Sequence, residues 1–326
     1  MQSTVLESQL SLIANDVMRH QLTQIRTFEP GARSGDSPED LHDMRVATRR
    51  LRAALSTFAH VLPAEARVLE RELRWLGSGL AAVRDLDVQL GRIGQVEAGE
   101  STDNRQALEQ VCYTLTARRE TARADLHRML DSERYARLIA LGGDMLTQPS
   151  PDEGLTLGLA AYPLVVRPFR HFRKRARHLS QDSPATEFHT VRKRARRLRY
   201  TVEFLTAAAP KAARSFTRRL VALQDVLGQH QDMEVAITEL QAIAEREPLP
   251  PGVIFALGQL AQRHAAEAGD LRSQFGGVYR SVVGKPWGDL EERLRRAAVR
   301  SRAEVQPELG DATTDDIQAA PARADK

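Results

Sequence analysis

The sequence predicts an all-α protein built by internal duplication. Of its 326 residues, 28% are charged and only 5% are aromatic, a composition typical of packed amphipathic helices. Apolar residues recur at helical spacing along most of the chain. The second half repeats polar as well as apolar positions of the first at a constant offset of 147 residues. Such a repeat favours two similar helical units.

The first half is predicted to contain four helices. A heptad-like apolar pattern opens at Val5 and ends near Phe28, where Pro30 and the glycines that follow break it. Asp36-Ser37-Pro38-Glu39 is typical of a helix cap with proline in the first turn. The predicted helices span residues 5–28, 38–62, 64–96 and 103–146, the last with a candidate break near Ser132.

The second half follows the same plan after a Pro-rich linker at 148–154, the only convincing linker near the middle of the chain. Its predicted helices span residues 155–179, 185–209, 210–245, 253–282 and 290–300. We therefore expect helical units at 1–147 and 155–302. The segment 303–326 has six acidic and two basic residues and no apolar period, so we predict a disordered acidic tail.

The duplication is clearest around the second helix of each half. Adding 147 to the residue number relates His42 to His189, Arg45 to Arg192 and Pro63 to Pro210. The register continues without a gap to Asp85 and Asp232. Packing alone does not require these polar matches, so the repeated polar residues are candidates for function.

Positive charge is concentrated in one part of the chain. Residues 167–199 hold twelve Lys or Arg against two acidic residues, a local charge of +10, although the whole chain carries only +4. Such a density favours an anionic partner, because unpaired cations repel one another. A solvated helix face is the ordinary alternative.

The repeated basic residues form a stripe on each second helix. The four residues of each stripe fall within an arc of roughly 80° around the helix axis. Each stripe lies next to the apolar face of its helix. The stripes are His42, Arg45, Arg49 and Arg52, then His189, Arg192, Arg196 and Arg199. A third basic face consists of Arg170, Arg173, Lys174 and Arg177. Arginine donates paired, charge-assisted hydrogen bonds to phosphate, so the stripes favour a phosphate-rich ligand over a ladder of salt bridges between helices.

Asp85 and Asp232 follow on the third helix of each half, and we predict that they orient the arginines rather than act as bases. The sequence has no phosphate loop, dinucleotide fingerprint or nucleophile elbow. No two histidines have the spacing of metal ligands on one helix, and the single cysteine excludes a disulfide. We therefore predict no catalytic residues, no cofactor and no metal site.

Four segments carry a resemblance to a known family. Residues 42–52 (HDMRVATRRLR) and 189–200 (HTVRKRARRLRY) resemble the two signatures of the CHAD family, the conserved-histidine α-helical domain. Residues 76–88 (LGSGLAAVRDLDV) and 223–228 (LQDVLG), with Asp232, resemble the segments that follow each signature. The resemblance covers about residues 5 to 300.

The resemblance implies two antiparallel four-helix bundles related by a pseudo-twofold axis, with a basic cavity between them that binds inorganic polyphosphate. It adds Lys193 and Arg197 to the eight stripe residues as binding residues, while the third basic face matches the family less closely. Some relatives carry an N-terminal CYTH domain that hydrolyses triphosphate. Nothing of that kind precedes Val5 in this sequence, so hydrolysis is not implied.

Two other classes of function remain as alternatives. A basic helical surface also attracts RNA or DNA, although the sequence offers few aromatics for base stacking and no nucleic-acid-binding module. A metal-dependent hydrolase would need clustered carboxylates that the sequence does not supply. With no signal peptide and no membrane-spanning run, we expect a cytoplasmic protein that does not contact membranes, with association with polyphosphate granules as a further expectation. The oligomeric state is not predicted.

Overall fold

The structure, a computed structural model, describes residues 5–35, 37–97, 102–149, 151, 154–246 and 249–305. Within these ranges the chain forms α-helices joined by short turns, one 3-10 helix and one isolated β-bridge. The prediction of an all-α fold is confirmed.

The first half is an antiparallel bundle whose fourth helix is broken in two. Its helices are α2 (Leu10–Ser34), α3 (Pro38–Thr57), α4 (Ala66–Glu97), α5 (Thr102–Leu130) and α6 (Glu133–Met145). The Ser37 hydroxyl accepts a hydrogen bond from the Asp40 N–H at 3.2 Å and caps α3, as its sequence predicts. Ser132 caps α6 in the same way, so the predicted break in the fourth helix is confirmed.

The second half repeats this plan. Its helices are α7 (Leu157–Ala176), α8 (Ala185–Phe204), α9 (Pro210–Arg246), α10 (Pro251–Val283) and α11 (Lys285–Val305), with a 3-10 turn η1 (Thr206–Ala208) before α9. Here the fourth helix breaks at Gly284, between α10 and α11. Leu51 and Leu198, one repeat apart, are both fully buried, which shows that the two halves use equivalent core positions.

Several predicted helix limits are wrong. The helices predicted at 38–62 and 185–209 end at Thr57 and Phe204, before the turns that precede Pro63 and Pro210. Helix α2 continues through Pro30 to Ser34, because a proline close to a helix end removes only one hydrogen bond and the left-handed Gly35 (φ 73°) makes the actual stop. The last helix is longer than the predicted 290–300, since α11 follows Gly284 directly and continues to Val305, beyond the expected limit at 302. The rest of the predicted acidic tail, from 306, lies outside the described residues.

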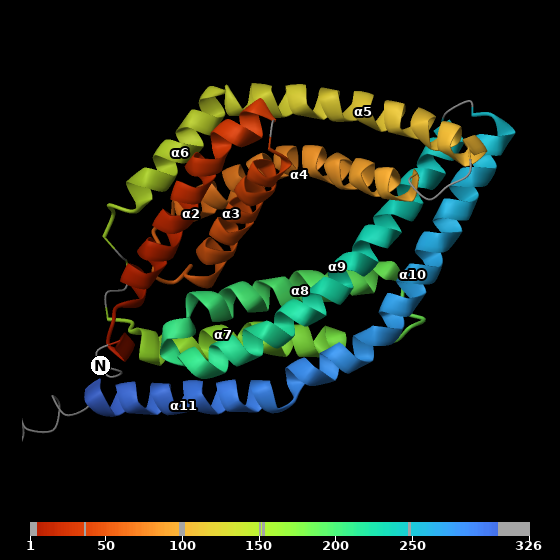
Figure 1. The fold of residues 1–326 in the computed structure, drawn as a ribbon. Helices are drawn as coiled ribbons and strands as arrows, with labels where there is room; N and C mark the ends of the chain where they lie inside the picture. The colour runs from red at the N-terminus through yellow and green to blue at the C-terminus, as the bar shows by residue number, and fades with distance from the viewer. Residues whose placement is uncertain are drawn as a thin grey trace, which may run out of the picture.

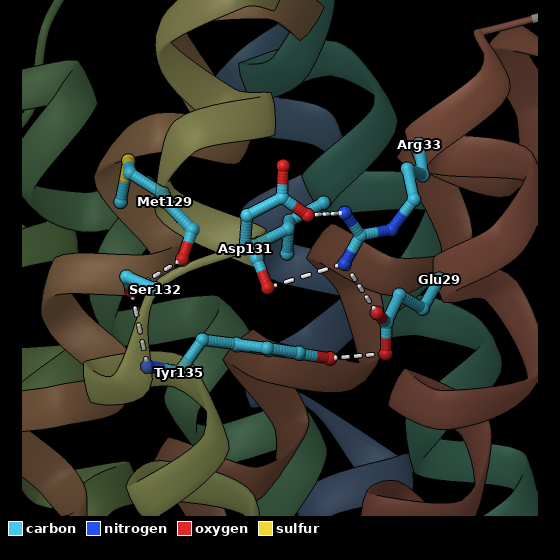
Figure 2. A network of polar contacts seen from close by, with 7 residues as sticks. Glu29, Arg33, Met129, Asp131, Ser132 and Tyr135 are labelled. Carbon is cyan, nitrogen blue, oxygen red and sulfur yellow. Dashed lines mark hydrogen bonds and ion pairs between the residues drawn. The ribbon is translucent and has the colours of Figure 1, made fainter.

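A polar network fixes the angle between α5 and α6 against α2 (Figure 2). The Tyr135 hydroxyl donates to Glu29 Oε2 at 2.7 Å, and Arg33 donates to Glu29 Oε1 at 2.9 Å. Arg33 also donates to the carbonyl of Leu130 at 3.1 Å and to Asp131, at the end of α5. The break in the fourth helix is therefore held by side chains of the first.

The two halves meet at two separate places (Figure 1). Near the chain ends, the main apolar core is continuous from α2, α3 and α4 into α7, α8 and α9. There the segment before α2 also pairs with the start of α7, where Leu10 N–H donates to Leu155 O at 2.8 Å and Leu157 N–H to Ser8 O at 2.9 Å.

The second meeting point is at the far ends of the long helices, where α5 packs against α10. A separate apolar cluster fills this contact with side chains from both halves. Its buried members are Ile93, Leu108, Val111, Leu115, Leu240, Ile243, Val253, Ala256, Leu257 and Leu260. We refer to it as the distal apolar cluster.

Helices α3 and α8 pack on each other across the pseudo-twofold axis. Arg50 donates to Glu203 Oε2 at 2.6 Å, and Arg197 donates to Ser56 Oγ at 2.7 Å. These two bonds are repeats of each other, because adding 147 converts Arg50 into Arg197 and position 56 into position 203. The duplication seen in the sequence is thus preserved in the contacts between the halves.

Candidate functional site

The two predicted stripes lie on α3 and α8, the helices that face each other across the pseudo-twofold axis. Leu41, Met44 and Leu51 are buried on α3, so the apolar face of the helix is fixed in the core and the neighbouring basic face is turned to the space beside α4. The equivalent residues Phe188, Val191 and Leu198 fix α8 in the same way against α9.

Four arginines from the two stripes come together. Burial lowers the pKa of the Arg45 guanidinium, and Arg49 on the same helix and Arg192 on α8 lower it further. Burial, followed by the Arg49 and Arg192 cations, lowers the pKa of Arg196 to about 9. We call Arg45, Arg49, Arg192 and Arg196 the central arginine cluster. All four remain charged at neutral pH, so they repel one another across the two halves.

The two predicted aspartates lie beside this cluster. Asp85 on α4 pairs with Arg45, with 3.7 Å between Oδ1 and the guanidinium nitrogen. Burial raises the pKa of Asp85; Arg45 opposes this and the nearby Asp232 adds to it. Asp232 on α9 in turn counteracts the lowering of the Arg192 pKa by burial. Two carboxylates therefore accompany four guanidinium groups, which leaves an excess of positive charge.

His42 and His189 lie at the edge of the same cluster. Burial lowers the pKa of His42, and Arg84, Arg49 and Arg45 lower it further against Asp43. In the second half the repeat of Arg84 is Gln231, whose side-chain oxygen is bonded to His189 Nδ1.

For His189 burial also lowers the pKa, Gln231 raises it, and the cations Lys193, Arg192 and Arg196 lower it. Both imidazoles are therefore neutral at pH 7. Three cations lie near each histidine, but the third is Arg84 of α4 in the first half and Lys193 of α8 in the second.

The last members of the two stripes have different surroundings. Burial lowers the pKa of Arg52 on α3, and Arg74 lowers it further against Glu70. Arg199 pairs with Glu203 at 3.5 Å from Nε to Oε1 and covers the ring of Tyr200 at 5.3 Å. Arg52 therefore widens the basic surface, whereas Arg199 lies at the same phenol as Arg49 and Arg196.

Tyr200 is a component that the sequence reasoning missed. Burial raises the pKa of its phenol, but the cations of Arg49, Arg199 and Arg196 outweigh that effect, so the pKa lies below its usual value. Its signal in the sequence is a position one helical turn after Arg196, which continues the basic stripe.

Three stripe arginines have unused donors. The Nε atoms of Arg49, Arg52 and Arg199 are buried, and none of them has a hydrogen-bond acceptor in the described part of the chain. A buried donor without a partner is costly, and in a native protein it indicates a missing ligand or water.

The remaining predicted residues lie apart from the four arginines of the cluster. Lys193 and Arg197 lie roughly 80° and 120° around α8 from the centre of the stripe, where they line a separate pocket. Arg173 on α7 and Arg177, which directly follows that helix, lie beside Tyr279 on α10, and Arg170 and Lys174 are exposed. Charge spacing along a helix could not show which neighbouring helix each face would meet.

No group of three or more His, Cys, Asp or Glu side chains suited to a metal ion occurs in the described ranges. None of the helices, as far as the structure describes them, is long and apolar enough to cross a membrane.

Comparisons with known proteins agree with the fold and the motifs. The family model described as CHAD domain matches residues 16–241. Two uncharacterized proteins from two strains of Mycobacterium tuberculosis are each 31% identical to the chain over 275 residues, which is 80% of this chain and 51% of theirs. The chain therefore spans about half the length of these curated relatives.

Two solved structures share the fold. The crystal structure of the CHAD domain from the plant Ricinus communis has a TM-score of 0.69 and 29% identity, covering 84% of this chain and 93% of that domain. PptA from Streptomyces chartreusis has a TM-score of 0.69 and 19% identity, covering 84% of this chain and all of PptA, and shows similarity of fold alone.

Proposed function

The chain belongs to the CHAD domain family, and on that basis we propose that it binds inorganic polyphosphate at the central arginine cluster without transforming it. The observation that carries the proposal is the convergence of Arg45 and Arg49 with Arg192 and Arg196 from the other half. Four guanidinium groups held together with two carboxylates are unfavourable without an anion.

The chemistry of these side chains suits a phosphate polymer. Each guanidinium offers a planar fork of donors that matches two phosphate oxygens, and successive residues of one helix face can contact successive phosphates. The free Nε donors of Arg49 and Arg52 would gain acceptors. Asp85 and Asp232 would hold the arginines in position. A cell that stores polyphosphate in granules would then recruit the protein to them.

A salt titration tests the electrostatic model. By analogy with single-stranded nucleic acids, a protein that neutralises six phosphates has a slope of about −4 when log K is plotted against log salt concentration. We expect a slope of this order for long-chain polyphosphate, measured by filter binding at several NaCl concentrations. A slope near zero would contradict the proposal.

Competition identifies the polymer. We expect unlabelled polyphosphate to displace labelled polyphosphate at lower concentrations than single-stranded RNA or heparin with the same number of charges. The arginines lie close together without exposed aromatic side chains among them, which favours a compact phosphate chain over stacked bases. If RNA competes better, the protein is a nucleic-acid binder instead.

Paired variants test whether the two halves grip one chain. We expect Arg49→Ala or Arg196→Ala to weaken binding about tenfold or more, since each removes a charge-assisted contact in a partly desolvated place. The double variant should give non-additive losses. Arg128→Ala, which removes an exposed arginine of α5, is the control and should bind normally. If each single variant instead binds half as much polyphosphate per chain with unchanged affinity, the two stripes are separate sites.

The proposal of a non-catalytic role has its own test. Incubation with polyphosphate, nucleoside triphosphates and Mg²⁺ should release no phosphate above a denatured control. Release that is lost in Asp85→Asn or Asp232→Asn would show that these acids do more than orient arginines.

A further inference from the structure

A second basic surface lies apart from the central arginine cluster, between α3, α7 and α8. It is a pocket of about 520 Å³. Its basic lining side chains are His60, Arg167, His171, Lys193, Arg194 and Arg197. Its floor is the buried pair Thr57 and Thr201, whose hydroxyls lie 3.2 Å apart.

The pocket has the charge of an anion site. Four of its side chains, Arg167, Lys193, Arg194 and Arg197, carry fixed positive charge. Among the described residues that line it, none carries a carboxylate, and none of these four cations forms an ion pair with one. The Arg194 Nε is buried and has no hydrogen-bond acceptor within the described chain.

The pocket is open to a ligand. Arg167, Lys193 and Arg197 are exposed at its rim, whereas the threonines beneath them are buried. Ser56 and Thr190 add hydroxyl groups to the lining, and the Ser56 hydroxyl already accepts a bond from Arg197. Donors therefore surround a space larger than a single tetrahedral oxyanion.

The pocket and the central arginine cluster use different faces of α8. Thr190, Lys193, Arg194, Arg197 and Thr201 follow one another along the pocket face of the helix, and none of them belongs to the cluster. The pocket residues Arg167 and His171 come from α7, which contributes nothing to the cluster. The repeat of His171 in the first half is Gln24, so the pocket is not a product of the duplication.

We propose that this pocket is a second anion site, which binds a compact oligophosphate such as inorganic triphosphate. Four fixed cations match the three to five negative charges of such a ligand, and the limited volume excludes a long polymer folded within it. The site does not depend on the proposed function, because its residues lie outside the cluster.

Calorimetry with inorganic triphosphate tests the proposal in a background without the cluster. In Arg49→Ala/Arg196→Ala, we expect one triphosphate to bind per chain. Adding Arg167→Glu and Lys193→Glu, both exposed and therefore harmless to packing, should weaken that binding at least tenfold. The exposed Arg128→Glu on α5 is the charge-matched control and should leave it unchanged.

Long-chain polyphosphate separates failure of this site from failure of the proposed function. Arg167→Glu in the otherwise unchanged protein should still bind long-chain polyphosphate at the central arginine cluster, whereas Arg49→Ala/Arg196→Ala should bind it much more weakly. The second site is refuted if triphosphate does not bind the cluster variant, or if the pocket substitutions leave its affinity unchanged. Circular dichroism of each variant confirms that the helices are intact.

Discussion

At the scale of single residues, the central arginine cluster differs from the other arginines of the chain. Several exposed arginines pair with an acid one turn away on the same helix, as Arg137 does with Glu133. Arg49 has a buried Nε without an acceptor in the described ranges, and its charge lowers the pKa of Arg45 and Arg196. The fold places cations where stability alone would not, which is typical of a binding site.

The histidines beside the cluster predict a pH dependence of binding. Burial and nearby cations hold the pKa values of His42 and His189 below the usual value, so both are neutral in the free protein at pH 7. A bound polyanion favours their protonated forms and raises those pKa values. Binding should therefore take up protons, and affinity should rise as the pH falls from 7.5 towards 5.5, which calorimetry in buffers of different ionisation enthalpy measures.

The stability of the free protein should change in the opposite sense. The unfolded chain binds protons on these histidines more readily than the folded chain does, so stability should fall as the pH drops through about 6.5. His42→Gln/His189→Gln should remove much of both effects, with the residual stability change due to His230, whose pKa burial also lowers. Affinity that does not vary with pH would show that the histidines lie outside the anion's reach.

At the scale of elements, the broken fourth helix of the first half depends on specific polar contacts. The Glu29 carboxylate joins Tyr135 of α6 to Arg33 of α2, and Arg33 reaches the end of α5 (Figure 2). Tyr135 is buried, and burial together with its bond to Glu29 raises the pKa of its phenol. Without this network, nothing in the local sequence beyond Ser132 would fix the angle between α5 and α6.

Removing the Tyr135 hydroxyl should therefore destabilise the protein. We expect Tyr135→Phe to lower the free energy of unfolding by about 1–2 kcal/mol, because it removes a hydrogen bond to a charged group in a partly buried place. Urea denaturation followed by circular dichroism measures the change. The control is Asp125→Ala on the neighbouring helix α5, which removes an exposed pair with Arg128 and should have little effect. If Tyr135→Phe and the natural protein have the same free energy of unfolding, the Tyr135 hydroxyl does not contribute to the stability of this contact.

At the scale of the whole molecule, the relative position of the two stripes depends on two contacts between the halves. The first contact consists of the main apolar core and the hydrogen bonds between α3 and α8. The second is the distal apolar cluster. The four long helices α4, α5, α9 and α10 connect these contacts (Figure 1). A closed arrangement resists rotation of one half against the other, which keeps the arginines of both halves together.

A substitution in the distal apolar cluster should consequently affect binding as well as stability. Ile243→Ala removes a buried side chain there, and we expect it to lower the free energy of unfolding by about 2–5 kcal/mol. Polyphosphate affinity should fall too, because the halves are less firmly aligned. Leu271→Ala on α10 is the matched control, since it empties a buried site in a third apolar cluster that is separate from both contacts between the halves. An equal loss of stability with unchanged affinity in both variants would contradict this coupling.

The sequence by itself determined the helices, the duplication and the basic stripes. Apolar residues at helical spacing and the caps at Ser37 and Ser132 act locally, so they can be seen without tertiary structure. The repeat at an offset of 147 even relates Arg50 and Arg197, whose contacts proved to be equivalent.

Only the tertiary structure decided which stripe residues meet. Arg45, Arg49, Arg192 and Arg196 converge because α3 and α8 pack across the pseudo-twofold axis, whereas Lys193 and Arg197, only one residue further along α8, face a different pocket. A step of one residue turns a side chain by about 100° around a helix, and the neighbours it then meets come from distant parts of the chain. Local patterns carry no information about those neighbours, so the division into a central cluster and a second pocket could not be predicted from the sequence.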